Sequence, residues 1–338
     1  VGAYLLDQKT NRVDICFAGE TILATGGLGQ IFLHTSNPKG ARGDGIAMAY
    51  RAGVRIINLE YIQFHPTTLY SGDSSSFLIS ESVRGEGGVL VDAEGRDFMK
   101  NYHPRGSLAP RDIVARAIHE EMLNQHLKCV YLDITHKPAG WIRERFPNIH
   151  ERCMKSGVDM TSQPIPVVPA AHYCCGGVAT DLSGHTSTER LWAVGEVSCT
   201  GVHGANRLAS TSLLEGLVWG SEAGRGVVEN LERMDYYFPE VDEWKHENDP
   251  VDPALIHQDW QTIRYTMWNY VGLVRSERRL RRARRILREL QMEVDEFYAR
   301  ALLNDRMLGL RNGVQTALAV VFAAFENRQS LGCHYRID

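Results

Sequence analysis

The sequence predicts an α/β protein of two or three domains that ends in a helical bundle. The chain has 338 residues, of which 43% are hydrophobic and 23% charged, so it has the length and composition to bury more than one core. Short apolar strand patterns ending at glycine turns alternate with amphipathic helical patterns up to about residue 232. From about Asp252 onward the patterns are helical only.

Composition excludes several classes of protein. A net charge of −4 gives no electrostatic reason to expect nucleic acid or an anionic membrane as the main partner. No apolar run reaches the roughly 20 residues that span a bilayer, and the first residues do not resemble a signal peptide. We therefore expect an aqueous intracellular location.

The cysteines do not predict a metal site. There are seven of them, and none forms a C-x-x-C pair that could bind zinc or act as a redox dithiol. Cys174 and Cys175 are adjacent, which favours buried structural thiols over a metal cage.

A hairpin and a glycine turn are expected at the start of the chain. The hairpin covers residues 4–17, and a short strand follows over residues 20–25. This strand ends in a turn that lets a nucleotide approach the backbone, because glycine has no side chain to block it: Thr25, Gly26 and Gly27. A complete strand, GxGxxG turn and helix with a following acidic residue does not occur anywhere.

The next elements carry the first candidate site residue. A helix is expected over residues 42–52, with Asp44 as its N-cap and Tyr50 on the same face as the apolar residues. A strand over residues 58–64 is then expected to deliver His65 to a loop, because the following proline disfavours helix.

Two helices place charged residues near their amino-terminal ends. Ser80, Glu81 and Arg84 have helical spacing, which indicates either a plain capped helix with one ion pair or a functional cluster. Residues 107–123 form a stronger helical pattern that has Arg111 near its amino terminus. The helix dipole disfavours a cation there, so Arg111 is a candidate functional residue.

The middle of the chain alternates strands and helices. A buried strand is expected over residues 130–134, a polar helix over residues 142–157, and an extended segment over residues 165–169 that delivers His172 to a loop. Residues 191–196 are expected to form a buried strand ending at Glu196. An acidic residue at a strand end in a nucleotide-binding fold commonly accepts hydrogen bonds from ribose hydroxyls.

A glycine-hinged loop over residues 202–207 carries His203, Asn206 and Arg207. Leucines then repeat at helical spacing from Ser212, which predicts a core helix whose amino terminus suits an anion. With His65 and His172, the loop supplies imidazole and guanidinium groups, the chemistry of a site for a small dicarboxylate.

The helical tail has an arginine run between Arg275 and Arg288. Such a run is compatible with nucleic-acid binding, but a solvated helix face or an interdomain contact is favoured. The family resemblance described below implies that Arg275 points towards the site.

Eight segments of the chain, in their order, resemble the L-aspartate oxidase branch of the succinate dehydrogenase and fumarate reductase flavoprotein superfamily. They are ATGGLGQIF, GDGIAMAYRAG, QFHPT, SESVRGEGG, LAPRDIVARAI, PIPVVPAAHYCCGGV, GEVSCTGVHGANRLASTSLLEG and NRQSLGCHYRID. The resemblance implies an incomplete FAD-binding domain, an α+β capping domain that binds substrate, and a helical domain. The implied boundaries are 1–60 and 171–232 for the FAD-binding domain, 61–170 for the capping domain and 245–338 for the helical domain.

The resemblance also implies roles for particular residues. Arg111 matches the proton-transfer group, and the residues that match the substrate site are His65, Ser80, Glu81, His172 and Arg207. The residues expected to contact a non-covalent FAD are Thr25, Gly26, Gly27, Glu196, Asn206, Ser212 and Leu213. No metal is implied.

The activity implied is oxidation of L-aspartate to iminoaspartate with oxygen or fumarate as acceptor, the first step of NAD biosynthesis through quinolinate. The expected partners are L-aspartate or a related C4 dicarboxylate and quinolinate synthase, in the cytoplasm or a plastid. A soluble fumarate reductase, a succinate dehydrogenase flavoprotein subunit and an inactive truncated module are the alternatives.

Two departures from the family pattern bear on these expectations. Leu331 stands where the family has an arginine, so no role is transferred to it. The first glycine-rich fingerprint is absent, so we expect this chain to be the carboxy-terminal portion of a longer flavoenzyme that binds FAD poorly by itself and is inactive alone.

Overall fold

The computed structural model describes residues 2–71, 77–233, 239–244 and 249–338. Its contacts divide the chain into two compact units. The second unit consists of residues 34–38 and 63–172, and the first unit contains the rest of the chain. Residues 245–248, at the start of the predicted helical domain, lie outside the described residues.

The first unit begins with the predicted hairpin. Strands β1 (Gly2–Asp7) and β2 (Arg12–Phe17) pair antiparallel, which confirms the prediction. Strand β3 (Thr21–Leu23) then pairs in parallel with β10 (Leu191–Ala193), so two segments far apart in sequence form one small sheet.

A second small sheet of the first unit has the strand order β11-β9-β4. Its strands are β11 (Ser198–Cys199), β9 (Gly177–Ala179) and β4 (Ile56–Ile57). Helix α1 (Asp44–Arg51) precedes β4 in the chain, as the sequence predicted. The part of the chain that the structure describes also has four short 3₁₀ helices, of which η1 (Gly29–Ile31) and η4 (Gly195–Val197) lie in the first unit, and η2 (Met99–Asn101) and η3 (Gly106–Leu108) in the second.

Two predictions about α1 are wrong. The N-cap is Gly43, whose φ of 82° lies in the left-handed region that favours glycine, and Asp44 is the first helical residue. The Asp44 carboxylate instead accepts hydrogen bonds from Arg42 at 2.9 Å and from Asn312 at 2.9 Å. Tyr50 is 56% exposed, because the buried face of α1 ends at the smaller residues beside it.

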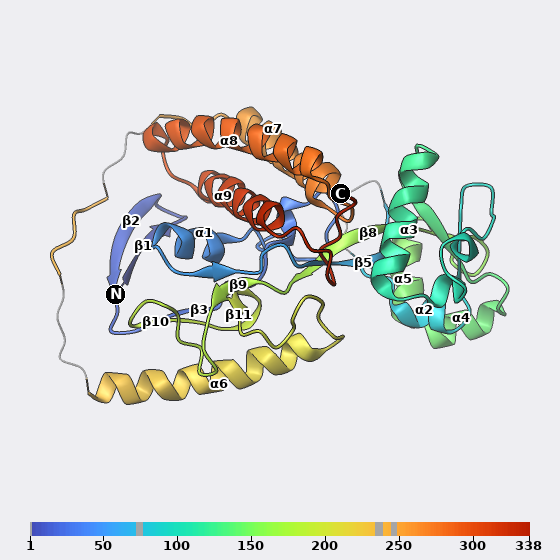
Figure 1. Cartoon of the computed structure of the whole chain (residues 1–338), viewed down its shortest axis with the longest axis horizontal. Coiled ribbons are helices and arrows are strands. Elements are labelled where there is room, and N and C mark those ends of the chain that lie inside the picture. The colour runs from blue at the N-terminus through green and yellow to red at the C-terminus, as the bar shows by residue number, and fades with distance from the viewer. Residues whose placement is uncertain (1, 72–76, 234–238, 245–248) are drawn as a thin grey trace. The chain divides into compact units, whose positions relative to one another are not determined.

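Helix α6 (Thr211–Glu232) forms where predicted, but it is not a core helix. Leu213 and Leu217 are 78% and 71% exposed. The face that packs contains Ala223, which joins Trp192 in a small buried cluster. Figure 1 shows α6 as one long helix along the edge of the first unit. The leucine spacing therefore predicted the helix correctly. The burial of its apolar face was predicted wrongly, because none of the described residues covers these leucines.

This packing predicts opposite outcomes for two substitutions in α6. A β-carbon on Gly226 would overlap the Trp192 ring, so Gly226→Ala is expected to lower the free energy of unfolding by about 1–3 kcal/mol through overpacking. Leu217→Ser removes only exposed apolar surface, and a change within about 0.5 kcal/mol is expected. Urea denaturation of both variants measures the difference, and a larger loss for Leu217→Ser would show that its face is covered.

The helical tail of the first unit is the predicted bundle. Helices α7 (Pro253–Val271), α8 (Glu277–Arg300) and α9 (Asp305–Glu326) pack against one another (Figure 1). Among the described residues, α9 is the one helix long and apolar enough to meet the criteria for a membrane span, but 61% of its apolar window is buried inside the fold. Burial against α7 and α8 accounts for this composition, since a helix apolar on most sides is typical of a domain core.

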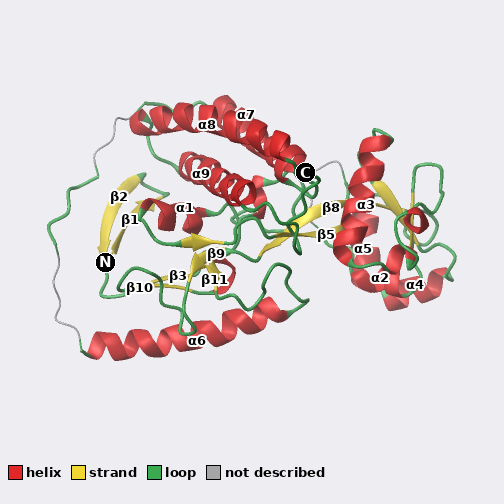
Figure 2. Cartoon of the chain, viewed as in Figure 1, coloured by secondary structure: helices red, strands yellow, loops and turns green. Residues whose placement is uncertain are grey.

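The second unit is built on a four-stranded sheet with the order β5-β8-β7-β6. The strands, yellow in Figure 2, are β5 (Ile62–Leu69), β8 (Ile165–Cys174), β7 (Val130–Asp133) and β6 (Val89–Val91). β7 pairs antiparallel with both β6 and β8. All residues of β5 are buried, so this strand lies in the core of the fold although it is at the edge of its sheet.

The helices of the second unit are α2 (Glu81–Gly85), α3 (Arg111–Asn124), α4 (Ala139–Arg145) and α5 (Pro147–Lys155). The polar helix predicted over residues 142–157 is wrong as a single element. It breaks before Pro147, which occupies the first turn of α5, where the missing N–H costs no hydrogen bond.

Candidate functional site

His65 and His172 lie on strands, not in the loops that the sequence predicted. They come from β5 and β8, which are neighbours in the sheet, and their ring centroids are 5.6 Å apart at an interplanar angle of 64°. Pro66 is tolerated in β5 because this is the edge strand, where a missing N–H does not break the sheet. Strand pairing therefore brings together two histidines that are far apart in sequence.

His65 is held in its neutral form. Burial is the first cause of a pKa well below the usual value, and His172, Arg111 and Arg84 add unfavourable positive charge. The Thr67 backbone N–H donates to Nδ1 of His65 at 3.2 Å, which assigns the ring proton to Nε2. His65 can therefore donate a hydrogen bond from Nε2 at neutral pH.

His172 is positioned by residues that the sequence analysis did not select. Its Nδ1 lies 2.6 Å from the Ser36 hydroxyl, and its backbone carbonyl accepts a hydrogen bond from the Asn37 side chain at 2.8 Å. Ser36 and Asn37 have no local sequence signal, because strand pairing alone brings them to a residue about 135 positions later.

Arg111, Glu81 and Arg84 form a connected charged cluster. Nε of Arg111 donates to the Glu81 carboxylate, and Glu81 also lies 3.7 Å from the Arg84 guanidinium. Arg111 and Glu81 are the first residues of α3 and α2, and α3 begins four residues later than the predicted start at residue 107. Ser80 caps α2, since its hydroxyl accepts the Ser82 backbone N–H at 3.3 Å. The structure thus shows the capped helix with its ion pair, joined to Arg111.

Arg84 is the buried member of this cluster, and it was not among the residues predicted to bind substrate. It is only 1% exposed, and burial lowers the pKa of its guanidinium. Nη1 donates to the Ser107 carbonyl at 2.8 Å, whereas Nε and Nη2 have no hydrogen-bond partner among the described residues. Two guanidinium groups that share one carboxylate beside a neutral imidazole favour binding of an anion.

In the first unit, Arg207 is oriented by an aromatic ring and by the start of α6. Its guanidinium lies over the Tyr173 ring, 4.4 Å from the centroid. Nη1 donates to the Ser212 hydroxyl at 3.2 Å, so two residues predicted for different ligands contact each other.

Glu215 holds the loop over residues 202–207 in place. Its carboxylate is buried and accepts hydrogen bonds from Thr200 at 2.6 Å and Tyr173 at 3.0 Å, and it lies 2.8 Å from Nε2 of His203. Glu215 was not predicted as a functional residue, although a glutamate inside an apolar helical pattern often indicates a buried, paired carboxylate. His203 therefore serves the loop's own structure.

Glu196 is the most distinctive of the predicted cofactor residues. It lies in η4, and a β-carbon on Gly27 would overlap its carboxylate, so a glycine is required at that position. The Cys174 backbone N–H donates to Oε1 at 3.0 Å. Burial raises the pKa of this carboxyl to about 7. A buried carboxyl with one backbone donor retains acceptor capacity for ligand hydroxyls.

The raised pKa of Glu196 predicts a pH-dependent stability. The folded state holds the proton more tightly than the unfolded chain, so the free energy of unfolding should fall as pH rises from about 4.5 to about 7, by about 3 kcal/mol. In Glu196→Gln this contribution should be absent, which makes the variant more stable than wild type above pH 7. Denaturation curves across this range measure the difference, and parallel pH profiles would contradict it.

The other predicted cofactor residues are not gathered into one cluster by the described contacts. Gly26 has a φ of 74° and open space where a side chain would lie. Asn206 accepts a hydrogen bond from the Cys333 thiol at 3.2 Å. Leu213 is exposed on α6, and Thr25 follows β3.

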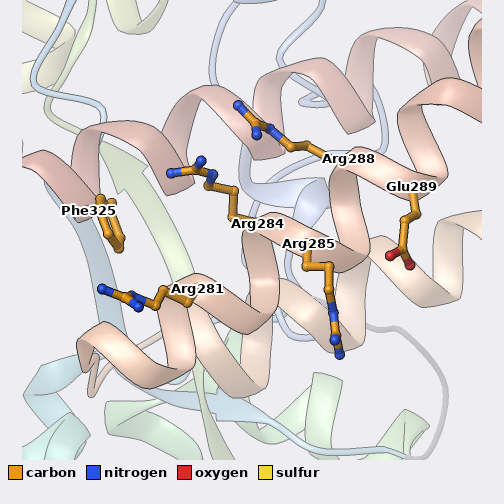
Figure 3. A pocket seen from close by; sticks show the side chains of 6 residues that line it. All are labelled: Arg281, Arg284, Arg285, Arg288, Glu289 and Phe325. Atoms are coloured by element: carbon orange, nitrogen blue, oxygen red, sulfur yellow. The ribbon is translucent and has the colours of Figure 1, made fainter.

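The arginine run lies on α8 and lines a separate cavity of about 520 Å³. Figure 3 shows Arg281, Arg284 and Phe325 close together, and the Glu289 carboxylate points away from these three side chains. The guanidinium of Arg284 lies over the rings of Phe322 and Phe325. None of the predicted site residues lines this cavity. Over the described ranges, no group of three or more His, Cys, Asp or Glu residues is arranged to hold a metal ion.

Family models match most of the chain. Residues 1–213 match the FAD binding domain, and residues 260–338 match the C-terminal region of the fumarate reductase flavoprotein. This chain belongs to the succinate dehydrogenase and fumarate reductase flavoprotein superfamily. FAD is accordingly its cofactor, and the predicted α/β fold with a helical carboxy-terminal region is confirmed.

Curated relatives of this flavoprotein chain are named L-aspartate oxidase. The Pseudomonas aeruginosa protein is 47% identical over 341 residues, which cover 100% of this chain and 63% of that protein. The chloroplastic L-aspartate oxidase 2-a of Nicotiana tabacum is 42% identical over 364 residues, covering 100% of this chain and 56% of that protein. The chain thus spans less than two thirds of the length of these relatives.

Solved structures show the same fold. A quinol-fumarate reductase matches with a TM-score of 0.85 at 29% identity, covering 100% of this chain and 64% of that one. The Sdh1 protein of Mycobacterium smegmatis matches with a TM-score of 0.82 at 32% identity, covering 99% of this chain and 59% of that one.

Proposed function

We propose that this flavoprotein oxidises L-aspartate to iminoaspartate, with FAD bound non-covalently and with oxygen or fumarate as the final acceptor. The observation that carries the proposal is the anion-binding cluster of the second unit, in which Arg84 and Arg111 share Glu81 beside the neutral His65. The names of the relatives support aspartate as the substrate.

The residues of the second unit have distinct proposed tasks. His65 donates from Nε2 to a substrate carboxylate, and because His65 is uncharged, Arg111 and Arg84 supply the positive charge beside it. Arg111 moves the proton, and Glu81 orients it by accepting its Nε hydrogen. His172, held by Ser36, and Ser80 complete the proposed contacts. Arg207, in the first unit, is proposed as a carboxylate-binding residue because its guanidinium lies over the Tyr173 ring.

The first unit carries groups that fit FAD. Glu196 has acceptor capacity for ligand hydroxyls, and Gly26 and Gly27 present bare backbone beside it. Bound FAD supplies the two-electron acceptor, while the protein binds and orients the substrate. Thr25, Asn206, Ser212 and Leu213 are proposed as further contacts with it.

The product would be consumed by a quinolinate synthase in NAD biosynthesis, and this enzyme is the proposed partner. We place the reaction in bacterial cytoplasm or a plastid, since the relatives come from bacteria and from chloroplasts. A fumarate reductase or succinate dehydrogenase activity is the second candidate, favoured by the fold shared with quinol-fumarate reductase.

Anaerobic visible spectroscopy with FAD in excess separates these candidates. The protein is titrated with L-aspartate and separately with succinate. Bleaching of flavin by aspartate alone supports the proposal, and bleaching by succinate alone moves the assignment to the dehydrogenase branch. Bound flavin that neither compound bleaches would contradict both.

A further inference from the structure

Two cysteines of the first unit meet beside the Arg207 loop. Cys175 follows β8, and Cys333 lies in the carboxy-terminal segment. The Cys175 backbone N–H donates to the Tyr61 carbonyl at 2.9 Å, and the Cys333 backbone N–H donates to the Ala205 carbonyl at 2.9 Å. Both backbones are therefore fixed, which limits how far the thiols can separate.

The two thiols contact each other. The side chains of Cys175 and Cys333 are hydrogen-bonded, and Cys333 packs against the buried cluster of Tyr61, Tyr173 and Cys175. Cys333 is the more exposed of the two, and its Sγ also lies 3.2 Å from Oδ1 of Asn206, so its single S–H proton can serve either partner. The pair thus has one thiol near solvent and one inside.

The surroundings favour a thiolate at Cys175 over Cys174 and Cys199. The hydrogen bond from Cys333, and then the backbone N–H and charge of Arg207, lower the pKa of Cys175. Burial instead raises the pKa of Cys174 and Cys199. Thiolate character makes Cys175 the better nucleophile, whereas exposure makes Cys333 the sulfur that a peroxide in solution reaches first.

We propose that Cys175 and Cys333 are an oxidation site that closes to a disulfide when the protein meets a peroxide. Hydrogen peroxide oxidises the Cys333 thiol to a sulfenic acid and is reduced to water. The Cys175 thiolate then attacks the sulfenic sulfur, forms the S–S bond and displaces hydroxide, which leaves as water with the Cys175 proton. Two thiols lose two electrons and two protons, and one peroxide becomes two waters.

The disulfide would change the surroundings of Arg207, the predicted substrate-binding arginine. It removes the thiol that donates to Asn206 and the thiolate that faces Arg207, and it ties the carboxy-terminal segment to the end of β8. Only the source of the oxidant rests on the proposed function, because a flavin oxidase that uses oxygen releases hydrogen peroxide. The thiol chemistry itself does not depend on that function.

Peptide mapping tests the proposal without any assay of activity. The chain is treated with hydrogen peroxide, remaining thiols are alkylated, and the digest is analysed by mass spectrometry before and after dithiothreitol. The expected result is a reducible peptide that joins Cys175 to Cys333. A link from Cys175 to Cys199, or oxidation to sulfinic acid with no link, would overturn the proposal.

Matched variants assign the two sulfurs. Cys333→Ser and Cys175→Ser should each lose the linked peptide, and Cys175→Ser should leave a sulfenic acid on Cys333 that dimedone traps. Cys174→Ala, next to the pair, and Cys16→Ser, on the exposed hairpin, should keep the link. Circular dichroism confirms that each variant is folded, and a link that persists in Cys333→Ser would refute the assignment.

Discussion

Arg111→Gln is expected to slow aspartate-dependent bleaching of the flavin by about 10²–10⁴-fold, the usual contribution of a positioned acid–base group. Glutamine keeps a hydrogen-bond donor for Glu81 but has no charge and cannot move a proton as a guanidinium does. The rate is measured by stopped-flow spectroscopy under anaerobic conditions, over a range of aspartate concentrations.

Arg116→Gln is the matched control for this experiment. Arg116 lies on the same helix and also pairs with a carboxylate, Asp112, at 2.8 Å, but it is not one of the predicted site residues. Its substitution should leave the bleaching rate within about threefold of wild type. A split between the two variants in maximal rate, at similar KM, distinguishes proton transfer from a merely structural role. Equal rates for both variants would remove Arg111 from the proposed mechanism.

Arg275→Met is expected to lower the free energy of unfolding by about 3–5 kcal/mol. Arg275 is fully buried. Nε donates to the carbonyls of Val271 at 3.0 Å and Gly272 at 3.2 Å, and Nη1 donates to the Glu60 carbonyl at 2.6 Å. Methionine would leave these buried carbonyls without their donor.

The partner of Arg275 on the tail is His334. Nη1 of Arg275 lies 2.6 Å from Nδ1 of His334, and burial, together with the charge of Arg275, lowers the pKa of His334 to about 4. The neutral ring therefore accepts at Nδ1, while burial lowers the pKa of Arg275 only to about 10 and leaves it charged at neutral pH. Arg285→Met, on an exposed position of α8, is the control and should change stability by less than about 0.5 kcal/mol. Equal denaturation midpoints for both variants would contradict the prediction.

The elements that the sequence predicted well are those with local causes. The hairpin over β1 and β2 follows from a polar turn between two apolar runs, and the bundle helices follow from long helical periodicity. Pro147 was also a local signal, and the break between α4 and α5 should have been predicted from it. Boundaries depended on finer geometry, since Gly43, not Asp44, caps α1.

The candidate site likewise has features that the sequence predicts and features that depend on the tertiary structure. Sequence alone determined which side chains are chemically suited to bind a dicarboxylate. Histidines and arginines that neighbour glycine or proline in the sequence can be identified without a structure. Only the tertiary structure decided that His65 and His172 face each other on paired strands, that Ser36 holds one of them, and that Arg84 joins Arg111 through Glu81. The apolar stripe of α6 shows why: periodicity records which face of a helix is apolar, whereas covering that face depends on contacts with segments distant in sequence, which no local pattern contains.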